Sequence, residues 1–179
     1  MKLNKIVLGV SLAFGIVSFV QAATDPTADL GHGTVTFTGS IVDAPCSIDP
    51  ESIDQTVDLG QVSNVALDNK GTSTPKSFTI KLDKCNIGDK GISVTAKFTG
   101  AEGSTAGLLG ITGSAKGASI AVIDGKGTLI DLGKSTEAQK LQNGNNTLLF
   151  SAYLQGDGAS GGVVPGDFKS VANFTLDYQ

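Results

Sequence analysis

The chain has 179 residues, with 13 lysines, no arginine and 17 acidic residues, which gives a formal net charge of −4. An acidic chain without arginine lacks the basic surface that nucleic acids and anionic lipids need, so neither is expected as a partner. No residue pattern suggests a small-molecule substrate either.

The first 22 residues have the pattern of a secretory signal peptide. Lys2 and Lys5 precede an apolar run of 15 residues, 6–20, and a small-x-small exit ends at Ala22. A transmembrane anchor, the alternative, needs roughly 20 apolar residues. We expect removal of residues 1–22, which leaves 157 residues with 11 lysines and 17 acidic side chains, a formal charge of −6. That length is sufficient for one domain with a hydrophobic core.

Short stretches that alternate in polarity, or are rich in β-branched residues, recur along the rest of the chain. Glycine, asparagine and aspartate separate them, which is typical of an antiparallel sandwich or barrel. The stretch "DGKG" at 124–127 predicts a hairpin turn, because Asp-Gly tolerates the positive φ of such turns. A helical turn or two is expected only in 135–142. The predicted strands are 34–44, 55–62, 77–82, 92–100, 119–124, 127–132, 146–155 and 167–178.

The last predicted strand raises a question of pairing. Its apolar residues alternate with polar ones through "VANFTLDYQ", so one face is expected to be buried. A half-buried strand normally has a neighbour on each edge. No further strand pattern follows this one, so one edge needs another partner.

The only two cysteines, Cys46 and Cys85, are predicted to form a disulfide, because the chain is expected to be exported. The bond would close a loop of about 40 residues and stabilise the fold by on the order of 4 kcal/mol in the chain-entropy model. A metal site at these cysteines lacks further ligands, since the chain has one histidine.

No catalytic arrangement is apparent in the sequence, and no cofactor or metal is expected. His32 lies between glycines, where a solvated role is favoured over a Ser-His-Asp site. The glycine clusters 31–33 and 107–113 lack the strand-to-helix context of a phosphate-binding loop. With no tryptophan and two tyrosines, the chain also has few rings for sugar binding. An enzyme is not expected.

Two motifs together resemble a known family. They are "GHGTVTFTGSIVDAPCSI" at 31–48 and "PGDFKSVANFTLDYQ" at 165–179, where Gly166 is fourteenth from the end and Tyr178 is penultimate. With the signal and the second cysteine, they resemble pilins of the chaperone–usher pathway, especially the shaft subunits of P-type and related fimbriae. The resemblance implies an all-β, incomplete immunoglobulin-like sandwich that lacks its last strand and is completed by a donor strand from another chain. It also implies passage through the periplasm to the surface of a Gram-negative bacterium, with related pilins, a periplasmic chaperone and an outer-membrane usher as partners.

The resemblance assigns residues 23–42 as a donor-strand extension and 43–179 as the pilin domain. The donor residues would be Gly33, Val35, Phe37, Gly39 and Ile41, which alternate along one face. The alternative is an ordinary first strand. Gly39 favours the donor role, because glycine weakens a strand unless close approach requires it.

The resemblance also assigns an acceptor groove and chaperone contact. Its residues would be Gly166, at the turn entering the last strand, and the inward positions Ala172, Phe174, Leu176 and Tyr178. These positions can equally be read as ordinary core. Residues 25–29 have no assigned role.

The function expected from this resemblance is that of a structural subunit of an adhesive fimbrial shaft, polymerising by donor-strand exchange. Two alternatives stay open. One is a carbohydrate-binding adhesin or tip-associated minor subunit, for which 157 residues leave no room for a separate receptor domain. The other is a free immunoglobulin-like domain whose strand set is completed within the same chain.

Overall fold

A computed structural model describes residues 32–89, 91–158 and 160–179. Contacts divide the chain into one unit that ends at Ile41 and a second that spans Val42–Gln179. The described part of the first unit, residues 32–41, contains no helix or strand. The predicted signal peptide and residues 25–29 lie outside the described residues. The domain boundary after residue 42 stays a prediction.

The regular secondary structure of the second unit is mostly antiparallel strands. In the described residues they run β1 (Ser47–Ile48), β2 (Lys76–Cys85), β3 (Ser93–Gly100), β4 (Leu109–Gly110), β5 (Thr112–Gly113), β6 (Ala118–Asp124), β7 (Leu129–Ile130), β8 (Gln139–Lys140), β9 (Gly144–Gly156), β10 (Phe168–Lys169) and β11 (Ala172–Tyr178). Two short helices, α1 (Pro50–Ile53) and the 3₁₀ segment η1 (Asn64–Lys70), lie between β1 and β2. No helix among the described residues is long and apolar enough to cross a membrane.

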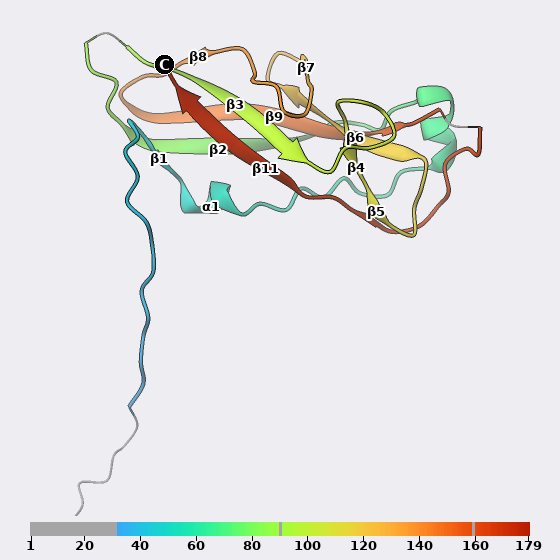
Figure 1. Ribbon diagram of the computed structural model, residues 1–179, viewed down its shortest axis with the longest axis horizontal. Coiled ribbons are helices and arrows are strands. Elements are labelled where there is room, and N and C mark those ends of the chain that lie inside the picture. The colour runs from blue at the N-terminus through green and yellow to red at the C-terminus, as the bar shows by residue number, and fades with distance from the viewer. Residues whose placement is uncertain (1–31, 90, 159) are drawn as a thin grey trace, which may run out of the picture. The chain divides into compact units, whose positions relative to one another are not determined.

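These strands form two main sheets that pack face to face (Figure 1). The larger has the order β1-β2-β9-β6-β4, with β7 also paired to β6, and the smaller has the order β11-β3-β8. A third, minor sheet joins β10 to β5. The predicted all-β, immunoglobulin-like sandwich is confirmed.

Alternating apolar residues of both sheets fill the space between them. Ile80 and Leu82 of β2 are fully buried. The ring of Phe98, from β3, meets Phe150 of β9 edge to face with centroids 5.1 Å apart, and Phe78 of β2 at 6.2 Å. Such edge-to-face pairs contribute beyond the burial of their area. The two sheets therefore share one aromatic core.

Three predicted elements are wrong. Residues 34–44 and 55–62 form no strand, and 135–142 form no helix. The third segment instead lies along β3, where the Thr136 N–H donates to the Ala96 carbonyl at 2.8 Å and β8 pairs with β3. This tertiary hydrogen bonding overrides a weak local helix preference. The predicted strands 127–132 and 167–178 are also shorter, since they contain only β7 in one case and β10 with β11 in the other.

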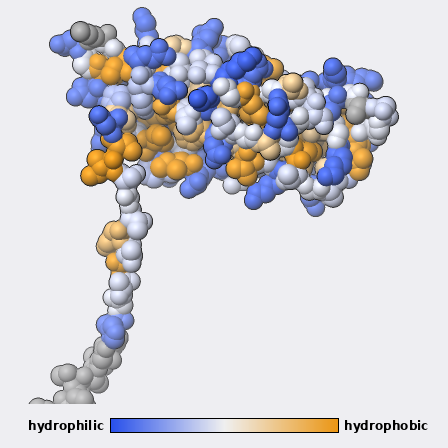
Figure 2. Space-filling model, viewed as in Figure 1, coloured by the Kyte–Doolittle hydropathy of each residue, from blue (hydrophilic) through white to orange (hydrophobic). Residues whose placement is uncertain are grey.

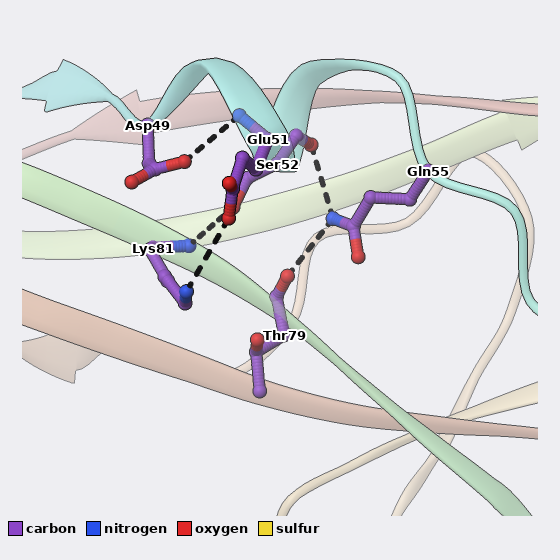
Figure 3. A network of polar contacts seen from close by, with 6 residues as sticks. All are labelled: Asp49, Glu51, Ser52, Gln55, Thr79 and Lys81. Carbon is purple, nitrogen blue, oxygen red and sulfur yellow. Dashed lines mark hydrogen bonds and ion pairs between the residues drawn. The ribbon is translucent and has the colours of Figure 1, made fainter.

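The segment 49–55 takes the place of a paired strand along part of β2 (Figure 3). Asp49 caps α1 by accepting from the Glu51 N–H at 2.8 Å. The buried Ser52 Oγ accepts from the Lys81 N–H at 3.0 Å, and Gln55 Nε2 donates to the Thr79 carbonyl at 2.9 Å. Side chains of this segment thus bond to the Lys81 N–H and the Thr79 carbonyl of β2, where a neighbouring strand would otherwise bond.

The predicted hairpin at 124–127 is confirmed between β6 and β7. Gly127 N–H donates to the Asp124 carbonyl at 3.0 Å, and Asp124 Oδ1 accepts from the N–H groups of Lys126 and Thr128. The positive φ falls on Gly127, at +85°, and not on Gly125. The Asp-Gly pair therefore marks the turn, but the second glycine has the positive φ.

The structure contains the Cys46–Cys85 disulfide, with both residues buried. It ties the residue before β1 to the last residue of β2. We expect titration of the unfolded, unreduced protein after removal of the signal to detect no free thiol. Replacing both cysteines by serine should lower the free energy of unfolding by roughly 2–5 kcal/mol, measured by urea denaturation. Two free thiols in the parental protein would contradict the pairing.

Candidate acceptor groove and donor segment

Strand β11 has one open edge. Within the described part of the chain it pairs only with β3, from Ala172 opposite Gly100 to Tyr178 opposite Val94. Gln179 and Ser93 exchange both backbone hydrogen bonds, at 2.8 and 2.9 Å. Because hydrogen bonding alternates along an antiparallel pair, the N–H and C=O groups of residues 172, 174, 176 and 178 face away from β3. Four residues of β11 therefore present backbone donors and acceptors to a further strand.

The side chains of those residues lie over an incompletely covered core. Phe174, Leu176 and Tyr178 are half-buried and pack against the core cluster, and the Phe174 ring lies 6.5 Å from that of Phe98. Partial burial raises the pKa of the Tyr178 hydroxyl, because it disfavours the phenolate. Ala172 differs from the other three in being exposed.

A groove of about 1060 Å³ adjoins the Ala172 end of β11. Residues 55–62 form one wall and 163–172 the other, while buried Leu67, Ile120 and Leu154 lie at its base. Figure 2 shows apolar side chains, in orange, interspersed with polar ones on the face that carries β11. An open strand edge beside an apolar groove is suited to β-augmentation, in which backbone hydrogen bonds and side-chain pockets act together.

Gly166 lies in the groove wall. It was expected at the turn that enters the last strand, but β10 lies between Gly166 and β11. Its φ is +157°, and a Cβ at this position would lie 2.7 Å from the Ala115 N atom. Gly166 thus permits a close backbone approach beside the groove.

The wall formed by 55–62 was not anticipated from the sequence, which predicted a strand for these residues. Their alternating Val57 and Leu59 gave no signal that separates a groove wall from a paired strand.

The predicted donor residues are available for contact. Val35, Phe37 and Ile41 are exposed to 74%, 90% and 103% of their reference areas. A Cβ built on Gly33 or Gly39 meets no atom within 4 Å. Three large apolar side chains in alternation, exposed in the isolated chain, favour a role in binding over an ordinary first strand.

The described residues contain no group of three or more side chains suited to holding a metal ion. A second hollow of about 470 Å³ lies between β3, β9 and the segment 136–139. The ion pair between Lys126 Nζ and Glu137 Oε2, 2.6 Å apart, connects two of the segments that line it. Both groups are solvent-exposed, so this pair adds little to stability.

The sandwich, the open β11 edge and the adjoining groove define an immunoglobulin-like domain that lacks its last strand. Comparison with known proteins identifies the family of this domain. The model of the family described as fimbrial protein matches residues 35–179. The chain is 58% identical to the Fimbria A protein of Serratia marcescens and 47% identical to the major MR/P fimbria protein of Proteus mirabilis, with each alignment covering all of both chains.

A solved structure of a chaperone–usher pilus, which addresses rod uncoiling, contains a similar chain. The TM-score is 0.74 at 36% identity, over 86% of this chain and 99% of the other. The chain belongs to the fimbrial protein family, as a pilin of the chaperone–usher type. It is a structural shaft subunit of an extracellular fimbria of a Gram-negative bacterium, and other pilin subunits are its partners.

Proposed function

We propose that this subunit polymerises by donor-strand exchange. Residues 33–41 of one copy occupy the groove and the open β11 edge of the next copy. The observation that carries the proposal is the open edge of β11, whose four inward residues lack a second strand in the described chain. The donor segment completes the neighbour's sandwich, and the repeated head-to-tail contact yields a filament because it does not close on itself.

Burial of the donor side chains supplies much of the stability of the contact. Val35, Phe37 and Ile41 are largely exposed in the free subunit. Transfer of each into the groove contributes roughly 1.5–3 kcal/mol. Backbone hydrogen bonds along β11 add to this and satisfy the groups on its open edge.

A periplasmic chaperone protects the same edge before assembly. An exposed strand edge beside apolar surface is prone to aggregation. Tyr178 and the terminal carboxylate form the chaperone's contact at the chain end, and the outer-membrane usher is the site of exchange. The subunit acts without catalysis, metal or cofactor.

A peptide exchange assay tests the proposal. The subunit is purified in complex with its chaperone and incubated with a synthetic peptide of residues 32–43. The peptide is expected to displace the chaperone, which size-exclusion chromatography would detect as free chaperone. The matched Phe37→Ala peptide should displace it at least about 10-fold more slowly, because it loses 1.5 kcal/mol or more of burial. Equal rates for the two peptides would contradict the donor role of Phe37.

A further inference from the structure

We propose that Val42 of one subunit packs against Val171 of the next, at the rim of the groove, and that this contact sets the register of the donor strand. The inference rests on the proposed donor-strand exchange. Val42 is 69% exposed and Val171 is 63% exposed, so each presents an unburied apolar side chain next to the predicted donor or acceptor residues.

The direction of the donor strand follows from the location of the groove. The cavity adjoins Ala172, at the start of β11. Ile41 is the last large donor residue, so an antiparallel strand places it at this cavity, whereas a parallel strand places it at the Tyr178 end, away from the cavity. Every strand pair in the described chain is antiparallel as well.

Alternation then limits the register. Inward donor residues must oppose inward residues of β11, since a shift by one residue would turn the apolar donor face to solvent. Val42 therefore lies opposite Lys169, Val171 or Asn173.

The register with Val42 opposite Val171 matches side-chain sizes inside the groove. It places Gly39 opposite Phe174 and Ile41 opposite Ala172, so that a small residue meets a large one at both positions. A shift that puts Val42 opposite Asn173 would instead set Ile41 against the Phe174 ring. That shift also leaves Val35 beyond Gln179, without a partner.

The same register matches polarity on the outer face. Thr38 lies opposite Thr175 and Ser40 opposite Asn173, both polar pairs, followed by Val42 opposite Val171. The remaining shift, with Val42 opposite Lys169, sets Ser40 against Val171 and leaves both valines beside polar groups. Directly opposed side chains are the contacts that stabilise paired strands, so only one of the three registers is matched on both faces.

Backbone geometry makes this contact testable by cross-linking. The residues of β11 that bond to the donor are 172, 174, 176 and 178, so Val171 belongs to a non-hydrogen-bonded pair. Such pairs have Cα atoms about 4.5 Å apart, which is within the range spanned by a disulfide. The native cysteines are bonded to each other, so they leave no competing thiol.

The experiment introduces Val42→Cys with Val171→Cys and oxidises the assembled fibres. Boiled, non-reducing gels should show a ladder of covalent oligomers that collapses to monomer with reductant. The matched controls are Val42→Cys with Lys169→Cys and Val42→Cys with Asn173→Cys, which should give monomer after boiling. A second variant, Val171→Asp, should lower the temperature at which the parental ladder dissociates.

The outcomes separate the two proposals. A covalent ladder from either control pair, or from none of the three pairs, would overturn the register while donor-strand exchange stands. An unchanged dissociation temperature for Val171→Asp would also overturn it. If the parental subunit forms no heat-labile ladder at all, the proposed function itself is wrong.

Discussion

Deletion of residues 171–179 is expected to abolish accumulation of the subunit in the periplasm. The deletion removes β11, the strand that covers one side of β3, and with it the half-buried Phe174, Leu176 and Tyr178. Full burial of such a side chain contributes roughly 1.5–3 kcal/mol. Half-burial of these three side chains, together with the backbone hydrogen bonds of the seven-residue pairing with β3, amounts to several kcal/mol. That loss is comparable to the 5–15 kcal/mol that holds a typical domain folded.

The deletion also removes the edge at which we propose the chaperone binds. Immunoblots of periplasmic fractions measure the outcome. The matched control is Thr175→Ala, which changes an exposed side chain of the same strand and should leave subunit levels near those of the parent. Normal amounts of soluble truncated monomer would show that β11 is required neither for a stable core nor for binding by the chaperone.

Gly39→Asn is expected to leave the chaperone–subunit complex intact and to prevent fibre formation. In the isolated chain a Cβ at Gly39 meets no atom within 4 Å, so the substitution should not affect the subunit's own fold. Inside a neighbour's groove the added amide would meet the core, and in the register proposed above it would meet Phe174. Unsatisfied polar groups cost about 1–3 kcal/mol, and overpacking costs a similar 1–3 kcal/mol.

Two measurements distinguish the possible roles of Gly39. Co-purification with the chaperone reports folding, and heat-labile ladders on gels report polymerisation. Ser40→Asn is the matched control, because it adds a side-chain amide on the outer face of the donor strand and should polymerise like the parent. If Gly39→Asn also polymerises normally, this residue enters no tight pocket. If the chaperone complex is lost, residue 39 belongs to the subunit's own fold.

Strong local patterns determined several elements from the sequence alone. The alternation in 77–82, 92–100 and 146–155 predicted β2, β3 and β9, because a period of two buries one face of a strand whatever its partners are. The hairpin at 124–127 followed from turn chemistry. The two cysteines of an expected exported chain pointed to the disulfide that the structure contains.

Tertiary structure decided the elements with weak local signals. Residues 135–142 carry a mild helical preference, yet Thr136 hydrogen-bonds to Ala96 of β3 and the segment extends. Residues 55–62 have the pattern of a strand, but Ser52 of α1 and Gln55 bond to the Lys81 N–H and the Thr79 carbonyl of β2, and residues 55–62 line the groove instead. Residues 34–44, which include most of the proposed donor segment, have the pattern of a strand, but a strand requires a neighbour to bond with.

The patterns in the sequence therefore determined an antiparallel all-β fold, the alternation of the last strand and the residues that alternate through 33–41, while the sandwich followed from the family resemblance. Only the tertiary structure decided where the groove lies, because its walls come from segments more than 100 residues apart. It also decided which edge of β11 is open, since that depends on the pairing with β3. Local alternation specifies which side chains share a face, whereas the partner of each edge is set by contacts between segments distant in the chain.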